Sequence, residues 1–145
     1  MQDEGTRVVT LIALFRRTAG LMVEELAERL RAAGFSDMTA AQHPVFENID
    51  REGTRLTVLA ARTGMTHQSM GELVQALEAR GYVRRMVDPS DRRARLVRLT
   101  PKGRRAVRRA IKEIAEIESN WLERFNRAGF EVDVRGMLEA GLGER

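Results

Sequence analysis

The sequence contains no cysteine and no long uninterrupted hydrophobic run. Without cysteine the chain has no disulfide, no cysteine–zinc site and no thiol-based oxidation switch. Charged residues interrupt every apolar stretch before it reaches the roughly 20 residues that a transmembrane helix needs. We therefore expect a soluble, cytoplasmic protein without a membrane partner. The 145 residues suit one globular domain, and they are enough to bury a core.

Histidine is also scarce. His43 and His67 are the only histidines, and neither has a second histidine or a carboxylate pair at metal-ligand spacing. The sequence likewise contains no recognisable nucleophile–base pair, catalytic carboxylate pair or phosphate-binding glycine loop. We therefore expect no metal, no cofactor and no enzyme activity.

Residues 56–100 read as a helix, a turn, a second helix and a basic ribbon. Thr57 is the expected cap of the first helix, and Gly64 is expected to end it in a left-handed conformation. Thr66 is the expected cap of the second helix, which Gly81 ends. This arrangement predicts a helix-turn-helix. The apolar residues of the second helix recur every three or four positions and mark its buried face: Met70, Leu73, Val74 and Leu77.

A two-stranded ribbon is expected after the second helix. Residues 82–87 have strand-like composition, and residues 95–99 alternate as a returning strand should. Between them, residues 88–91 (Asp-Pro-Ser-Asp) are strong turn formers. The ribbon forms a wing beside the helix-turn-helix. The predicted fold is therefore mainly α, with a small β-hairpin wing.

Positive charge is concentrated in the same region. Between Arg51 and Arg109 there are 15 Arg or Lys and 5 Asp or Glu, a net charge of +10, whereas the whole chain carries only +4. Such charge beside a helix-turn-helix is expected of a surface that binds duplex DNA, because phosphate neutralisation supplies most of the non-specific affinity. A run of charges alone usually marks a solvated face. The helix-turn-helix and its basic ribbon favour DNA.

Long helices are predicted on both sides of this unit. From Arg7 to about Arg31 the apolar residues keep helical spacing, and Ala33-Gly34 ends the pattern. Thr100-Pro101 is a clear helix start, and the helix that it opens carries an apolar stripe and ends at Gly129. A short final helix follows. A monomer would expose these stripes, so we predict an obligate homodimer.

One more helix is predicted from Thr39 towards Asn48. Its proline, Pro44, is tolerated in the first turn of a helix but disturbs a later turn, because it lacks an N–H and its ring is rigid. We therefore expect this helix to start late or to kink near His43-Pro44.

The wing resembles that of the MarR (multiple antibiotic resistance regulator) family of winged-helix transcription factors. The family's wing signature is an Asp-x-Arg followed, after a short strand, by Leu-Thr, and here Asp91, Arg93, Leu99 and Thr100 hold these positions. Residues 73–83 are also similar to the end of the family's recognition helix and the entry to its wing. The resemblance covers essentially the whole chain in length and element order, and its specific part lies within about residues 56–103.

The resemblance implies a single MarR-like domain over residues 1–145. Residues 39–100 would be its winged helix-turn-helix DNA-binding region, and residues 7–34 and 101–145 its dimerisation helices. It implies a homodimeric, sequence-specific regulator of double-stranded DNA, which represses pseudo-palindromic promoter sites and is released by a small, often aromatic, effector. Two recognition helices related by a twofold axis would enter successive major grooves roughly 34–36 Å apart.

Candidate DNA contacts lie on the recognition helix and at the wing tip (residues 88–95). Glutamine bonds adenine bidentately, hydroxyls serve base or phosphate, and a helix N-terminus favours phosphate. Arginines at a narrow hairpin tip suit the minor groove, where the negative potential is enhanced. Asp91 would repel phosphate, so we interpret it as a brace for a neighbouring arginine and for the turn. The candidates are Thr66, His67, Gln68, Ser69 and Glu72 on the helix, and Arg92, Arg93 and Arg95 in the wing.

Two of these assignments stay open. His67 is either a DNA contact or plain exposed surface. Glu72 either accepts a hydrogen bond from cytosine or is an exposed helix residue that weakens non-specific binding. The family more often places a basic or hydroxyl residue in this turn, so Gly71 and Glu72 depart from its pattern.

The resemblance also implies a ligand cleft between the dimerisation helices and the winged domain. Phe15, His43, Phe46 and Trp121 are candidates to line this cleft. Apolar and aromatic residues at helical spacing are more often ordinary core, so both interpretations of these four residues stand.

An alternative function is a winged-helix protein–protein interaction module without sequence-specific DNA binding, because fold alone does not fix function. The wing tip discriminates between the two. An interaction module has no need for Arg92, Arg93 and Arg95 together beside a surface of net charge +10.

Overall fold

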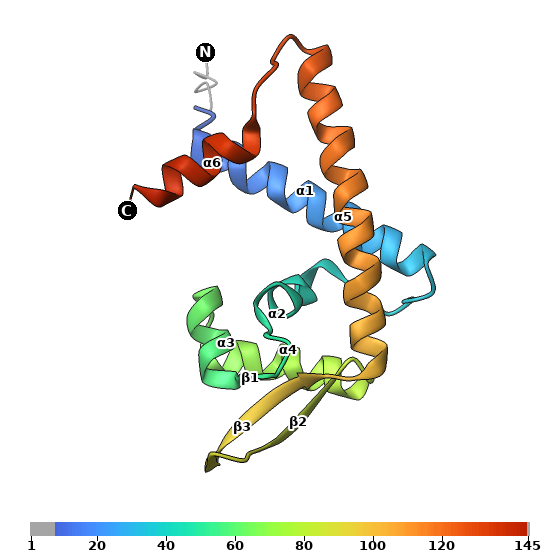
Figure 1. Cartoon of the computed structure of the whole chain (residues 1–145), viewed down its shortest axis with the longest axis vertical. Coiled ribbons are helices and arrows are strands. Elements are labelled where there is room, and N and C mark those ends of the chain that lie inside the picture. Colours follow the sequence, from blue (N-terminus) through green and yellow to red (C-terminus); the bar gives the residue numbers. More distant parts are fainter. Residues whose placement is uncertain (1–7, 145) are drawn as a thin grey trace, which may run out of the picture.

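The computed structural model describes residues 8–144, in which helices form the frame and a small antiparallel sheet forms the wing (Figure 1). Its elements, in chain order, are α1 (Leu11–Ala32), η1 (Ala40–Gln42), α2 (His43–Asn48), β1 (Thr54–Arg55), α3 (Leu56–Thr63), α4 (His67–Ala79), β2 (Val83–Asp88), β3 (Asp91–Leu99), α5 (Pro101–Arg127) and α6 (Val134–Gly143). The predicted fold class is confirmed. Within residues 8–144 no helix is both long and apolar enough to cross a membrane.

The long helices α1 and α5 cross each other, and the helix-turn-helix and the wing lie at the lower end of α5 in Figure 1. α5 continues directly from β3 of the wing, because Thr100 caps it and Pro101 occupies its first turn. The helix start predicted at Thr100-Pro101 is confirmed. α5 therefore connects the wing directly to the region where α5 crosses α1.

α1 begins later than the sequence predicts. Thr10 caps it, because its hydroxyl accepts a hydrogen bond from the backbone N–H of Ala13 at 3.1 Å. The predicted start, at Arg7, lies outside the described residues. α1 ends at Ala32, and Gly34 then turns the chain with a φ of 102°. The predicted end of this helix is therefore confirmed.

Pro44 delays the helix that follows. Residues 40–42 form the short 3₁₀ element η1, and α2 starts only at His43, which places Pro44 in its first turn. A proline loses no intrahelical hydrogen bond at this position. The predicted late start near His43-Pro44 is confirmed.

α3 and α4 form the predicted helix-turn-helix. Gly64 ends α3 with a left-handed φ of 66°, and Thr66 caps α4 by accepting a hydrogen bond from the backbone N–H of Ser69 at 3.1 Å. The predicted cap at Thr57 is wrong. The extended residue before α3 is Arg55, which pairs in β1, so the helix begins one residue before Thr57.

The wing contains a third strand that the sequence analysis does not predict. β3 lies between β1 and β2, and both Thr54 and Arg85 stand opposite Val97. β1 has only two residues, too few for an alternating pattern to be visible. β3 also begins at Asp91, four residues before the predicted returning strand. The longer β3 carries the candidate wing arginines, and its pairing with β2 shifts register between Val87 and Asp88 at the tip.

The core lies between α4, the sheet and α5, and it extends to α1, α2 and α3. Its largest side chain is that of Tyr82, whose hydroxyl donates a hydrogen bond to Asp37 at 2.5 Å. The ammonium group of Lys102 lies 4.2 Å from the centre of the same ring. These contacts tie the loop after α1 to the first turn of α5. The fully buried side chains are those of Val45, Leu59, Met70, Val74, Leu77, Tyr82, Val83, Val97 and Ile117.

Gly103 allows α5 to approach the end of the recognition helix closely. A Cβ atom at Gly103 would overlap the backbone carbonyl of Tyr82, which cannot swing away as a side-chain end can. We expect Gly103→Ala to lower the free energy of unfolding by about 1–3 kcal/mol, the range for overpacking a core. Gly20→Ala is the matched control, because a Cβ there meets nothing within 4 Å in α1. It should be neutral or stabilise by up to about 1 kcal/mol. Urea denaturation of both variants measures this difference, and equal stabilities would contradict the close approach.

Candidate nucleic-acid interface and adjoining cavity

The N-terminal half of α4 is open to solvent. Thr66, His67, Gln68, Ser69 and Glu72 are all exposed, as a surface that reads DNA requires. Two of them also hold the helix start together, because the Thr66 hydroxyl donates a hydrogen bond to the Ser69 hydroxyl at 2.9 Å while it caps α4. The helix N-terminus is therefore ordered and exposed, which is the geometry that favours a phosphate.

The wing tip presents three arginines. Arg92, Arg93 and Arg95 are exposed, and none of them makes an ion pair with a carboxylate within residues 8–144. Their charges are therefore available to an external anion. Arg85 of β2, by contrast, pairs with Glu78 at 3.0 Å.

Asp91 braces the turn but not an arginine side chain. Its carboxylate accepts a hydrogen bond from the backbone N–H of Arg93 at 3.0 Å. Asp91 therefore contacts the neighbouring Arg93 through its backbone, and it makes no ion pair with a side chain of the described residues. The carboxylate that pairs with an arginine here is Asp88, which lies 2.7 Å from Nε of Arg55.

Asp88 anchors the wing tip to the base of the sheet. Its side chain accepts hydrogen bonds from the hydroxyl and the backbone N–H of Ser90, at 2.7 and 2.8 Å, and from Arg55 of β1. The Ser90 bonds and then the Arg55 guanidinium lower the pKa of Asp88 to about 2. This carboxylate therefore stays charged at neutral pH. From the sequence only a turn role could be predicted for Asp88, because Arg55 is 33 residues away in the chain.

Comparison with known proteins supports the DNA interpretation of this geometry. A family model described as MarR family matches residues 36–94. The transcriptional regulator HosA of Escherichia coli O111:H- is 32% identical over 91 residues, which cover 62% of this chain and 67% of HosA. The chain belongs to the MarR family. Its members are transcriptional regulators rather than enzymes.

Two solved structures of the regulator CouR resemble this MarR-family chain over most of its length. The transcriptional repressor CouR bound to a 23-mer DNA duplex is 28% identical, with a TM-score of 0.69 over 93% of this chain and 91% of CouR. CouR from Rhodococcus jostii RHA1 bound to p-coumaroyl-CoA is 25% identical, with a TM-score of 0.70 over 91% of this chain and 88% of CouR. Winged-helix regulators that bind DNA and small molecules therefore share this fold.

A cavity of about 510 Å³ adjoins the DNA-binding part of this MarR-family chain. It lies between α1, the η1–α2 segment and α5, where the two long helices diverge. Of the four predicted lining residues, His43 and Phe46 line it. Most of the lining is aliphatic and comes from α1 and α5: Ala19, Met22, Val23, Leu26, Ala27, Leu30, Ala106, Val107, Ala110, Ile111, Ile114 and Ile117.

Phe15 and Trp121, the other two predicted residues, do not line this cavity. Phe15 lies four residues before the first lining residue of α1, and 54% of its surface is exposed. Trp121 packs against Phe125, with ring centres 6.0 Å apart, and against the Arg124 guanidinium. Both residues are on the predicted helices, but they lie beyond the part of each helix that faces the cavity.

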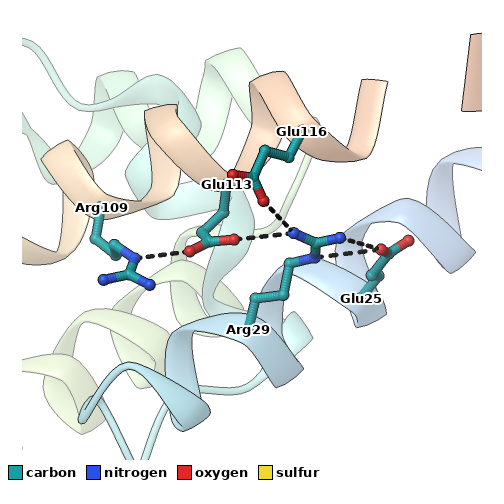
Figure 2. Close-up of polar contacts among 5 residues, drawn as sticks. All are labelled: Glu25, Arg29, Arg109, Glu113 and Glu116. Carbon is teal, nitrogen blue, oxygen red and sulfur yellow. Dashed lines mark hydrogen bonds and ion pairs between the residues drawn. The ribbon is translucent and has the colours of Figure 1, made fainter. Parts of the chain in front are cut away.

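A network of ion pairs joins α1 to α5 near their crossing. Figure 2 shows Arg29 of α1 between three carboxylates, and Glu113 of α5 between two arginines. Arg29 lies 3.1 Å from Glu113, and Arg109 lies 2.7 Å from the other oxygen of Glu113. Glu113 is only 6% exposed. We call these residues the α1–α5 ion network: Glu25, Arg29, Arg109, Glu113 and Glu116.

The α1–α5 ion network was not predicted from the sequence. One signal was visible, because Arg109 and Glu113 are four residues apart and therefore adjacent on a helix. The partner on the other helix, Arg29, is 84 residues from Glu113. The hydrogen bonds from Arg109 and then Arg29 lower the pKa of Glu113, so this buried carboxyl stays charged at neutral pH.

Proposed function

We propose that this MarR-family protein is a homodimeric repressor that binds pseudo-palindromic promoter sites and is released by a small effector. In this proposal α4 reads the major groove and the wing tip enters the minor groove. Residues 39–100 bind DNA, whereas residues 7–34 and 101–145 dimerise. The proposal takes the whole chain, residues 1–145, as one domain.

The observation that carries the DNA proposal is the set of unpaired arginines beside an open recognition helix. Arg92, Arg93 and Arg95 have no carboxylate partner within residues 8–144, and neither have Arg84 and Arg98 of the same sheet, whereas Arg55 and Arg85 pair with carboxylates. The wing therefore carries a surplus of positive charge that is open to an external anion. Unpaired guanidinium groups at a narrow tip are suited to the minor groove, and exposed Gln68 and Ser69 are suited to base edges.

The dimer proposal rests on apolar surface that the single chain leaves uncovered. α6 has no buried residue. The N-terminal half of α1 exposes a comparable set of side chains. A soluble monomer rarely exposes so many large apolar side chains together, and a second copy would cover them. The exposed residues are Leu11, Ile12, Leu14, Phe15, Phe130, Val132, Met137, Leu138 and Leu142.

The effector proposal rests on where the cavity lies. α5 runs from the wing to the crossing with α1, and the cavity sits between these helices and α2. A molecule that fills the cavity would bias the angle between α1 and α5, and in a dimer this angle sets the separation of the two recognition helices. The relative CouR, named a repressor, has been solved with DNA and with p-coumaroyl-CoA.

Fluorescence anisotropy of labelled duplexes tests the function. The duplexes are selected from a random pool and from the gene's own upstream region, and the protein is titrated at several salt concentrations. We expect tight binding to a pseudo-palindrome, one dimer per site and a steep loss of affinity with salt. Sedimentation velocity gives the stoichiometry. Weak, sequence-blind binding would instead favour the protein–protein interaction module, and a monomer at micromolar concentration would contradict the dimer.

A further inference from the structure

The cavity between α1, α2 and α5 has an unusual balance of charge. Its polar lining residues are Thr39, His43, Glu47 and Glu118, and the rest of the lining is apolar. It is lined by carboxylates but by no lysine or arginine of the described residues. A ligand that enters it therefore finds negative charge and no fixed positive charge.

The carboxylates lie at the open side of the cavity. The Glu47 side chain is 65% exposed and that of Glu118 is 40% exposed, so both are at the mouth rather than at the base. A second, shallower depression adjoins this mouth and shares His43 and Glu47 with it. Glu24 of α1 lines that depression as well. The approach to the cavity is therefore acidic.

Only one of the two lining carboxylates has a permanent cationic partner. Glu118 pairs with Arg135 of α6 at 2.7 Å, so its charge is largely neutralised. Glu47 has His43 at 3.7 Å, and that contact becomes an ion pair only when the imidazole is protonated. Glu47 is therefore the group at the mouth that attracts a cation from solution.

These charges favour a cationic ligand over an anionic ligand of the same shape. An anionic ligand would lose its hydration in an apolar cavity that has no lysine or arginine in its described lining to replace it, and it would also meet Glu47. A cationic ligand would place its apolar body against Met22, Ala110 and Ile114 and keep its charged group at the mouth. Its charge would then remain partly hydrated and close to a carboxylate.

We propose that the effector of this protein is a compact apolar organic cation, held by the aliphatic cavity and by Glu47 at its mouth. The proposal rests on the proposed function, because it names the class of molecule that would act at the effector site. It separates this chain from its relative CouR, which was solved with p-coumaroyl-CoA, a ligand with anionic phosphates.

Isothermal titration calorimetry with ligands of matched shape tests the charge preference. The probes are 4-tert-butylbenzylamine, 4-tert-butylbenzyl alcohol and 4-tert-butylbenzoate, together with the corresponding three naphthyl compounds. For each skeleton we expect the amine to bind at least tenfold more tightly than the carboxylate, with the alcohol between them. Anisotropy of the protein–duplex complex, titrated with the same probes, reports whether binding releases DNA.

Substitution of Glu47 tests the residue that carries the preference. Glu47→Gln should weaken amine binding about fivefold, as expected for one exposed charge pair, and leave alcohol binding unchanged. Glu123→Gln is the matched control, because it removes the same charge from an exposed site on α5 that does not line the cavity. Equal effects of the two substitutions would overturn the role of Glu47.

The outcomes for the ligand and for the regulator are distinguishable. Carboxylate binding as tight as amine binding would overturn the cation class while leaving the cavity as an effector site. Failure of all six probes to bind at millimolar concentration would overturn the cation proposal, and duplex binding measured without any probe would still test the regulator. Amine binding without any loss of DNA affinity would support the ligand class and contradict release.

Discussion

Replacing Arg93 with alanine should weaken duplex binding by about ten- to hundredfold at moderate salt, the range for losing the contacts of one guanidinium that becomes buried against DNA in the complex. The Arg93 side chain is exposed and has no carboxylate partner within residues 8–144, so its charge is free to follow the potential of the minor groove. The slope of log affinity against log salt should also become less steep, by about one counterion. Anisotropy titrations at three or more salt concentrations measure both quantities.

The control for Arg93→Ala must remove the same charge elsewhere. Arg127→Ala does so, because Arg127 is exposed at the end of α5 that is far from the wing (Figure 1). We expect it to leave the salt slope nearly unchanged. Both variants should melt as the parent protein does, because neither side chain is buried. An unaltered affinity for Arg93→Ala would place the wing outside the DNA interface.

Local chemistry explains which parts of the fold could be predicted from sequence. Thr66 and Thr100 cap their helices as predicted, because a hydroxyl at a cap bonds an N–H only three residues away. Gly64 takes the predicted left-handed φ at the end of α3, and Gly81, which was predicted to end α4, also has a positive φ. Each of these features depends on a few consecutive residues. The helix boundaries of the DNA-binding region were readable for this reason.

Long-range geometry explains what the sequence did not predict. β1 is visible only because it pairs with a strand more than 40 residues later. Phe15 and Trp121 were placed on the correct helices, yet they do not line the cavity. Which stretch of a helix faces a cavity depends on where α1 and α5 cross, and a periodic stripe does not encode that point. The position of Glu47 at the mouth of the cavity could not be predicted for the same reason.

The α1–α5 ion network offers the second large effect. Glu113 is buried and bonds arginines on both sides, so Glu113→Gln should lower the free energy of unfolding by about 2–3 kcal/mol, the value of a hydrogen bond between charged groups. Glu116→Gln is a matched control, because Glu116 bonds the same Arg29 at 2.8 Å but its side chain is 59% exposed. That substitution should cost about 1 kcal/mol or less. Urea denaturation at pH 7 compares the two variants.

The same network makes stability depend on pH in a defined direction. The pKa of Glu113 is lowered below its ordinary value of 4.5 in the folded protein, so folding favours the charged carboxylate. Its contribution is therefore fully present above about pH 4.5, and it is lost as the pH falls through the lower pKa of the folded state. The Glu113→Gln variant has no carboxylate at this position, so it lacks this pH-dependent contribution to stability. The difference in the free energy of unfolding between the parent and this variant should be constant from about pH 6 to 7, where Glu113 is charged in both states. It should shrink below pH 4.5.

A constant difference in stability down to acid pH would mean that Glu113 acts through packing rather than charge.

Loss of the α1–α5 ion network should also weaken DNA binding. Arg29 and Glu113 hold α1 to α5, and in the proposed dimer the angle between these helices sets the separation of the recognition helices. A looser crossing spreads the dimer over separations that do not match successive major grooves, so a smaller fraction is competent to bind. Glu113→Gln should thus weaken binding to the pseudo-palindrome more than binding to a single half-site, whereas Arg93→Ala should weaken both.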